Sequence, residues 1–161
     1  MERIKPTGIY GYLGRCLLRM ASKSGVYRYY TENKYLIEEY KFKAIKKPFS
    51  QNIHYELEAP RNTGIRAFNV RSFARYQGFD LYIENCDDKT LLVAPLDDDA
   101  FFKAYPRRIW HKSWYDARDS RFEIGEEEVS DIWEERTPIE GFKFDVEPMV
   151  YLKKDGIWLT E

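Results

Sequence analysis

Apolar and polar residues alternate along residues 53–58, IHYELE, and this pattern is typical of a strand with one solvated face. Residues two apart on a strand share a face, so His54, Glu56 and Glu58 should project together. The apolar positions of the segment should face the core: Ile53, Tyr55 and Leu57. The pattern therefore predicts a half-buried strand that presents two carboxylates and an imidazole on one side.

Between residues 8 and 22 the apolar positions follow a different period, that of one helical stripe. The stripe consists of Ile9, Leu13, Cys16, Leu17 and Met20. Thr7 stands where a helix N-cap is expected, and Gly25 lies past the end. The pattern predicts an N-terminal core helix over 8–22.

The chain then becomes rich in Tyr, Ile and Phe, and Pro48 and Pro60 interrupt it. This composition favours strands over 26–31 (VYRYYT), 34–45 (KYLIEEYKFKAI) and 52–59 (NIHYELEA). The segment GIRAFNVRSF, 64–73, alternates less regularly and is interpreted as a further strand or an irregular edge.

The segment 34–45 has two interpretations. Leu36, Tyr40 and Ala44 are spaced four apart, as on one face of a helix. Asn33 and Lys34, which precede it, resemble a hairpin turn instead. We interpret the segment as a strand.

Two hairpins are predicted in the second half of the chain. The first joins FDLYIE, 79–84, to TLLVAPL, 90–96, through NCDDK, and its continuously apolar stretch Leu91 to Ala94 is typical of a central strand. The second, within 149–159, turns at Asp155 and Gly156, where the tolerance of Gly for positive φ suits a type I′ turn.

Two short helices complete the expected elements. The acidic triplet Asp97 to Asp99 can cap a helix over 99–105, DAFFKAY, which Pro106 stops. Residues 126–136, EEEVSDIWEER, are expected to form the other helix, with its apolar side chains inward: Val129, Ile132 and Trp133. The predicted class is α+β, with an N-terminal helix and a mixed, mostly antiparallel sheet, or α/β if some strands are parallel.

Composition and charge limit the classes of protein to which the chain can belong. The chain has 161 residues, 43% hydrophobic and 33% charged, which predicts a single folded domain over 1–161. A net charge of −1 argues against coating nucleic acid through bulk charge and leaves a local basic patch open. Cys16 and Cys86 lack CxxC spacing, which indicates a reducing, cytoplasmic setting. The sequence contains no apolar segment of transmembrane length, so no membrane association is expected.

The first candidate chemistry is a divalent-metal site. If the strand that contains Glu39 and Lys41 pairs with 53–58 through the loop at Pro48, Glu39 reaches Glu56. Two carboxylates around Mg²⁺ or Mn²⁺ are what metal-assisted phosphodiester hydrolysis requires. The competing interpretation is that these charges form the solvated face of an ordinary sheet.

The order helix, strand, strand with an acid and strand with Glu-x-Glu, followed by RAFNVRSFARYQGFDLYIENCDDKTLLVAPLDD, resembles the core of PD-(D/E)xK, or restriction-endonuclease-like, nucleases. The resemblance covers about residues 8–99 and leaves 100–161 as a helical and hairpin extension. It implies a nuclease core in which Glu39 is the first acid, Glu56 the second, and Glu58 takes the place of the usual Lys. No Pro-Asp precedes Glu39, and another register uses Glu39 and Lys41 as the acid-x-Lys pair. We prefer the first register, in which the resemblance implies Glu39 and Glu56 as the metal ligands.

Basic residues interleaved with aromatics follow this segment. Arginine forks suit phosphate oxygens, and aromatic rings stack on unpaired bases, so the pattern indicates contact with DNA or RNA. The arginines of the first cluster are Arg61, Arg66, Arg71 and Arg75, and the second cluster contains Arg107, Arg108, His111 and Lys112. The competing interpretation is that they are surface salt-bridge partners.

Other chemistry is not suggested. His54 and His111 have no activating Ser or Cys nearby, and Gly64 and Gly78 belong to no nucleotide-binding motif. The main hypothesis is therefore a nucleic-acid-associated protein with a nuclease-like fold, and its candidate activity is metal-dependent phosphodiester hydrolysis.

The alternative is a non-enzymatic inhibitor or immunity-type protein that blocks a toxin or nuclease. Acidic residues would cover the basic cleft of such a partner, and tryptophans would anchor the contact. The acidic residues are Asp97 to Asp99, Glu126 to Glu128, Glu134 and Glu135, and the tryptophans are Trp110, Trp114 and Trp133.

Overall fold

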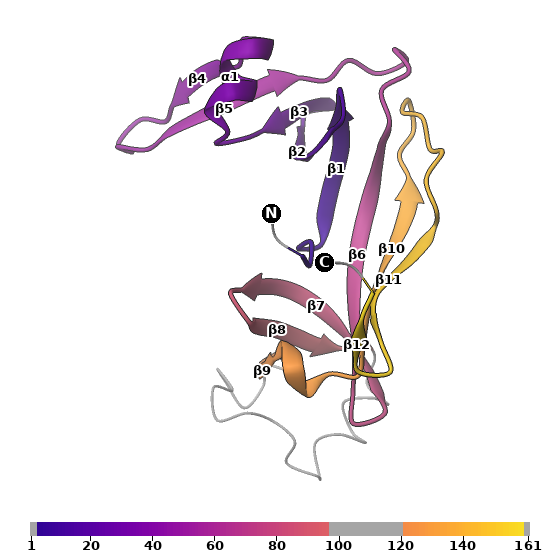
Figure 1. The fold of residues 1–161 in the computed structure, drawn as a ribbon. Coiled ribbons are helices and arrows are strands. Elements are labelled where there is room, and N and C mark those ends of the chain that lie inside the picture. Colours follow the sequence, from indigo (N-terminus) through magenta and orange to yellow (C-terminus); the bar gives the residue numbers. More distant parts are fainter. Residues whose placement is uncertain (1–2, 97–120, 160–161) are drawn as a thin grey trace. The chain divides into compact units, whose positions relative to one another are not determined.

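The computed structural model describes residues 3–96 and 121–159. Within these residues strands account for 57% and helix for 8%, so the chain is a mostly β fold (Figure 1). The predicted α+β class, with its restriction-endonuclease-like core, is therefore wrong. The described residues fall into two compact units, which are treated one at a time.

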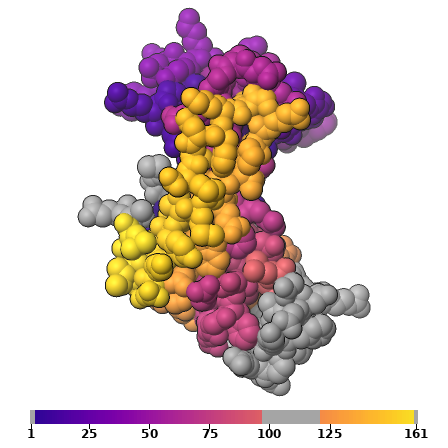
Figure 2. Space-filling view, turned by 90° about the vertical axis from the view of Figure 1, so that its right-hand side faces the viewer, coloured from indigo at the N-terminus to yellow at the C-terminus, as the bar shows by residue number. Residues whose placement is uncertain are grey.

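The first unit contains residues 3–7, 70–96, 121–136 and 147–159. Its strands follow the hydrogen-bonded order β12-β11-β10-β6-β7-β8-β9, and the pairs with an assigned register run antiparallel. The strands are β6 (Ala67–Tyr76), β7 (Phe79–Asp87), β8 (Thr90–Pro95), β9 (Phe122–Gly125), β10 (Asp131–Pro138), β11 (Met149–Lys154) and β12 (Ile157–Trp158). In Figure 2 the β11–β12 hairpin, in yellow, lies on the surface that faces the viewer.

One face of this sheet forms a core from alternate strand positions. Leu81 and Ile83 on β7 and Leu91 and Val93 on β8 are fully buried, as period-two alternation requires. Phe122 on β9 is also fully buried in this cluster. Strand β8 pairs with both β7 and β9, which confirms the prediction of a central strand over Leu91 to Ala94.

The second unit contains Gly8–Asn69 and Thr137–Val146. Its strands follow the order β1-β2-β3-β5-β4, with the first residues of β6 beside β1. They are β1 (Gly8–Leu13), β2 (Cys16–Lys23), β3 (Val26–Tyr30), β4 (Lys43–Lys46) and β5 (Ile53–Glu58). The helix α1 (Lys34–Tyr40) connects β3 to β4.

The N-terminal helix predicted over 8–22 is wrong, because these residues form the β1–β2 hairpin. Leu13 pairs with Cys16, so Gly14 and Arg15 make a two-residue turn, and Gly14 has φ 61. A glycine with positive φ at the first central position is what a type II′ hairpin turn requires. The apolar stripe is real, but alternate residues such as Ile9 and Met20 face the core from strands.

The strand predicted over 34–45 is also wrong in its first half. Residues Lys34–Tyr40 form α1, and the Asn33 side chain caps the helix by accepting from the backbone N–H groups of Tyr35 and Leu36. Ile37 and Tyr40, three residues apart on one helix face, pack against the core of the second unit. The strand part is shorter, with β4 beginning at Lys43.

Both predicted hairpins of the second half are confirmed. Strands β7 and β8 pair antiparallel, with the turn at Asp88 and Lys89. Strands β11 and β12 turn at Asp155 and Gly156, which have φ 50 and 79, as a type I′ turn requires.

The helix predicted over 126–136 is wrong. Only Glu126–Glu128 forms a single 3₁₀ turn, and β10 follows at Asp131. The burial expected for Val129, Ile132 and Trp133 is nevertheless found, because a strand and the turn before it supply the same inward positions. The helix expected over 99–105 lies outside the described residues.

A tyrosine lies at the centre of the second unit's core. Tyr29 is 1% exposed, and its hydroxyl donates to the Tyr12 carbonyl oxygen at 2.7 Å. Burial disfavours the tyrosinate and raises the pKa of Tyr29 to about 12. The folded state therefore holds this proton in a pH range where the unfolded chain releases it.

This shift predicts alkaline instability. Because the folded pKa is raised from 10.0 to about 12, the stabilisation is present below pH 10 and is lost as the pH rises through 12. In Tyr29→Phe we expect a shallower fall in the free energy of unfolding over this range, measured by urea titration at stepped pH. Tyr35→Phe is the control, because Tyr35 is 84% exposed, and it should keep the wild-type slope. Equal slopes for wild type and Tyr29→Phe would contradict the prediction.

Candidate nucleic-acid interface

The second unit has a polar sheet face opposite its core. Strand β5 lies between β3 and β4, and Glu56 stands opposite Tyr30 on β3 and Lys43 on β4. Two residues further along β5, Glu58 stands opposite Arg28. Because side chains alternate, Tyr55 and Leu57 of β5 pack against the core while Glu56 and Glu58 face away from it.

A pocket of about 320 Å³ opens on this polar face. We call it the β3–β5 pocket, and its lining residues are Arg28, Lys41, Lys43, Ile45, Glu56, Leu57 and Glu58. Three residues singled out from the sequence thus come together here: Lys41, Glu56 and Glu58. Arg28 and Lys43 join them and were not identified as site residues from the sequence.

The carboxylates of the pocket are partly neutralised from within. Arg28 Nε lies 3.4 Å from Glu56 Oε1, and the two side chains are 29% and 23% exposed. Beside them, burial raises the pKa of Tyr30, and the negative charge of Glu56 raises it further. Glu56 is therefore engaged by a guanidinium and a phenol of the neighbouring strand.

The lysines of the pocket are in a different situation. Lys41 ends α1 in the left-handed conformation with φ 57, and Lys43 begins β4 two residues later. Both are exposed, and neither has an ion pair or side-chain hydrogen bond with another described residue. With Arg28, they give the pocket three cationic side chains against two carboxylates.

Glu39 does not join this group. It lies exposed on α1 and is not among the pocket's lining residues, although β4 and β5 do pair as a hairpin through the loop at Pro48. His54 is exposed on β5 opposite Ile45 and also lies outside the lining. Within residues 3–96 and 121–159, no three His, Cys, Asp or Glu side chains cluster as metal ligands would.

The arginines predicted to contact nucleic acid have partners within the chain. In the second unit Arg66 lies 4.2 Å from the centre of the Tyr12 ring and 3.7 Å from Asp145. In the first unit Arg71 lies 4.5 Å from the centre of the Tyr82 ring. The β3–β5 pocket gathers none of them.

Arg75 is the most strongly engaged of these arginines. Its Nε donates to Asp80 at 2.8 Å and one terminal nitrogen donates to Asp131 at 3.1 Å. The hydrogen bond to Asp80 is the main cause that raises the pKa of Arg75. These two carboxylates neutralise the guanidinium group of Arg75, which the sequence predicts as a phosphate-binding group.

Several predicted residues lie outside the described part of the chain: Arg107, Arg108, His111, Lys112, Asp97 to Asp99, Trp110 and Trp114. Of the other acidic residues considered for a protein-binding face, Glu134 is fully buried and so is unable to meet a partner's surface. Glu127 and Glu128 are exposed.

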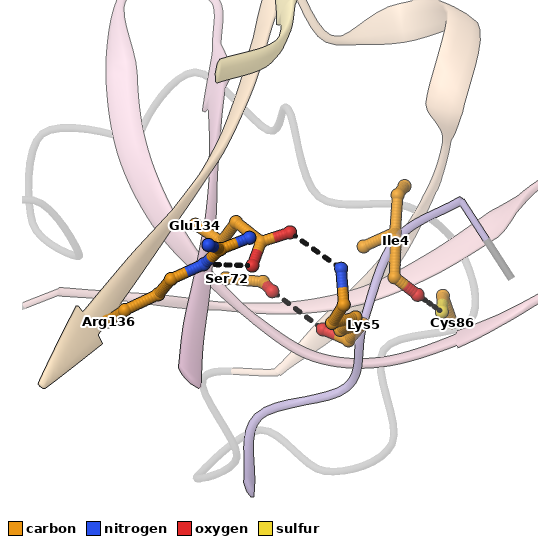
Figure 3. Close-up of polar contacts among 6 residues, drawn as sticks. All are labelled: Ile4, Lys5, Ser72, Cys86, Glu134 and Arg136. Atoms are coloured by element: carbon orange, nitrogen blue, oxygen red, sulfur yellow. Dashed lines mark hydrogen bonds and ion pairs between the residues drawn. The ribbon is translucent and has the colours of Figure 1, made fainter. Parts of the chain in front are cut away.

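Glu134 belongs to a polar cluster inside the first unit (Figure 3). Lys5 Nζ donates to one of its carboxylate oxygens at 3.0 Å, and Arg136 Nε donates to the other at 3.1 Å. Ser72 Oγ donates to the Lys5 carbonyl oxygen at 2.6 Å, and the Cys86 thiol donates to that of Ile4 at 3.3 Å. The cluster fastens the N-terminal segment to the sheet, which is a structural role.

No protein-family model, no curated protein sequence and no solved structure matches the chain. In the ranges 3–96 and 121–159, no helix is long and apolar enough to cross a membrane. The arrangement of described residues is therefore the basis for a functional proposal.

Proposed function

We propose that this protein binds nucleic acid and that Lys41 and Lys43 hold phosphate groups at the β3–β5 pocket. One observation carries the proposal: within the described residues, Lys41 and Lys43 line the pocket without a carboxylate partner. A lysine ammonium acts as a point charge for phosphate oxygens. The net charge of −1 is compatible with this, because a cluster on one face acts locally within a screening length of about 8 Å.

Two further lysines follow the pocket residues in the chain, and by strand alternation Lys46 lies on the face of β4 opposite Lys43. Lys46 and Lys47 continue the same segment and are exposed, so four lysines lie within residues 41–47. Strand β4 stands at the end of the strand order in its unit, which leaves the lysines of this segment open to an extended polyanion. Lysines on an edge strand also discourage edge-to-edge aggregation, and the experiment below separates that role from phosphate binding.

The proposal covers binding and does not extend to hydrolysis. A metal-dependent nuclease needs carboxylates that converge on Mg²⁺ or Mn²⁺. Here Glu56 pairs with Arg28, and Glu39 is not part of the pocket. A protein partner such as a toxin stays a prediction from the sequence.

The test is a salt titration of binding. Lys41→Ala/Lys43→Ala is expected to weaken binding of labelled single-stranded oligonucleotides in fluorescence anisotropy about tenfold or more near physiological salt. The slope of log K against log salt should fall by about 1.4, because each lost phosphate contact on a single strand removes about 0.7. The matched control is Lys89→Ala/Lys154→Ala, which removes two exposed lysines of the first unit.

The control variant should keep the wild-type affinity and slope. Equal losses in the two variants would mean that total charge, and not the β3–β5 pocket, governs the interaction. Wild-type protein that binds neither DNA nor RNA at low salt would overturn the proposal. Circular dichroism spectra of all variants should superimpose on that of wild type.

A further inference from the structure

The tip of the β4–β5 hairpin carries an unusual aromatic residue. Phe49 is fully exposed, with a relative accessibility of 109%, and its backbone has φ 66. Positive φ is uncommon for a bulky residue without special demands on the backbone, and it raises the question of function. A ring exposed to this degree buries almost none of its surface against the rest of the molecule.

The tip is nevertheless an ordered turn. Lys46 pairs with Ile53 at the last position of the ladder. Within the loop the Ser50 N–H donates to the Lys47 carbonyl oxygen at 3.2 Å, and the Asn52 N–H donates to Ser50 Oγ at 3.2 Å. The phenyl ring is thus presented to the surroundings by a closed loop.

The neighbours of Phe49 indicate what it meets. Lys46 and Lys47 precede it and are exposed, and the segment leads back along β4 to Lys43 and Lys41 at the β3–β5 pocket. Lysine is depleted at protein–protein interfaces, whereas nucleic-acid interfaces are strongly positive. A single ring among lysines therefore fits a nucleic acid better than a protein surface.

The ring also distinguishes between forms of nucleic acid. Aromatic side chains stack on bases whose faces are free, and in a duplex those faces are covered by neighbouring base pairs. A duplex would engage the lysines alone and leave Phe49 in water. A single strand offers phosphates to the lysines and a base to the ring.

We propose that the ligand is single-stranded nucleic acid, and that Phe49 stacks on an unpaired base while the β3–β5 pocket holds the backbone. This inference rests on the proposed function and names its substrate class. Stacking is tolerant of sequence because every base has a π-face, so binding is expected to depend little on base sequence.

The experiment compares Phe49→Ala with Phe49→Trp on three labelled probes in fluorescence anisotropy. The probes are oligothymidylate and oligouridylate of about 12 nucleotides and a DNA duplex of the same length. Phe49→Ala should weaken binding of both single strands about tenfold, the typical loss for one stacked base, and leave duplex binding within about twofold of wild type. Phe49→Trp should restore the affinity, and its added indole fluorescence should be quenched by the single strands.

The outcomes separate this inference from the function on which it rests. Unchanged single-strand binding in Phe49→Ala, together with a loss in Lys41→Ala/Lys43→Ala, would overturn the stacking and leave phosphate binding in place. An equal loss on duplex and single strands in Phe49→Ala would also overturn it. Wild-type protein that binds none of the three probes would overturn both the stacking inference and the proposed function, and would favour a protein partner for the exposed tip.

Discussion

Replacing Glu134 with alanine is expected to lower the free energy of unfolding by about 3 kcal/mol. The Glu134 side chain is 0% exposed and accepts from Lys5 Nζ and Arg136 Nε, whose side chains are 23% and 14% exposed. Removing the carboxylate leaves the partly buried Lys5 ammonium without its counter-charge and removes one partner of Arg136, which costs more than the pair itself contributes. Urea unfolding followed by tryptophan fluorescence measures the loss.

The control for this prediction is the neighbouring residue. Glu135 is half-buried and has no ion pair with another described residue, so Glu135→Ala should change stability by no more than about 0.5 kcal/mol. Adding Lys5→Ala to Glu134→Ala should cost less than the sum of the two single losses, because the second change removes an unpaired charge. Strict additivity would show that Lys5 and Glu134 do not interact energetically.

Phe122→Ala is expected to be at least as damaging, with a loss of about 3–5 kcal/mol. Phe122 is 0% exposed on β9, and its ring centre lies 6.2 Å from that of Tyr76 in the core of the first unit. Deleting the ring removes its transfer free energy and leaves a cavity that the close-packed sheet is only partly able to fill. The urea midpoint should fall while the m-value stays unchanged.

A phenylalanine of opposite environment provides the comparison. Phe49 is fully exposed, so Phe49→Ala should alter stability by no more than about 0.5 kcal/mol. Similar losses for the two variants would contradict the placement of Phe122 in the core. The same measurement establishes that Phe49→Ala is folded when it is used in the binding experiment.

The hairpins could be predicted because their turns and strands carry local signals. Asp155 and Gly156 accept positive φ, and the alternation on either side assigns each residue to a face. The run Leu91 to Ala94 lies on β8, which has a paired strand on each side, and Leu91, Val93 and Ala94 are buried. In these segments the turn residues and the pattern of apolar positions predict the same hairpin.

The error at the N-terminus has a physical cause. The spacing fits a helical stripe, but it is equally compatible with two short strands that fold back on each other. The residues concerned are Ile9, Leu13, Cys16, Leu17 and Met20. The deciding signal is Gly14, since a glycine in mid-helix costs about 1 kcal/mol, whereas a hairpin turn requires it. Gly8 and Gly11 weaken a helix in the same way.

The error over 34–45 is the reverse, because the sequence predicts a strand where the structure has a helix. Asn33 is typical of a turn, and it is equally a good helix N-cap. Its side chain accepts two backbone N–H groups of the first turn of α1. A helix of seven residues has too few turns for its period to outweigh the β-rich composition around it.

The candidate site could be predicted in part. The alternation along 53–58 correctly placed Glu56 and Glu58 on one face, away from Tyr55 and Leu57, but the core position that it predicted for Ile53 is wrong, because Ile53 is 52% exposed. Their neighbours on β3 and β4 depend on the strand order, in which β5 lies between β3 and β4 and reverses the chain order. Arg28 and Glu56 are 28 residues apart in the sequence, and no local pattern contains the information that they meet.

The fastening of the N-terminal segment sets the order in which the chain can fold during synthesis. Lys5 and its partner Glu134 are 129 residues apart. The ribosome makes Lys5 long before it makes Ser72 and Glu134. At that stage the strands on both sides of β6 are also missing from the first unit. The segment stays solvated until β10 has been translated, because closing such a long loop is slow and is stabilised only by the final contacts. The N-terminal segment therefore joins the first unit only after β10 has been synthesised.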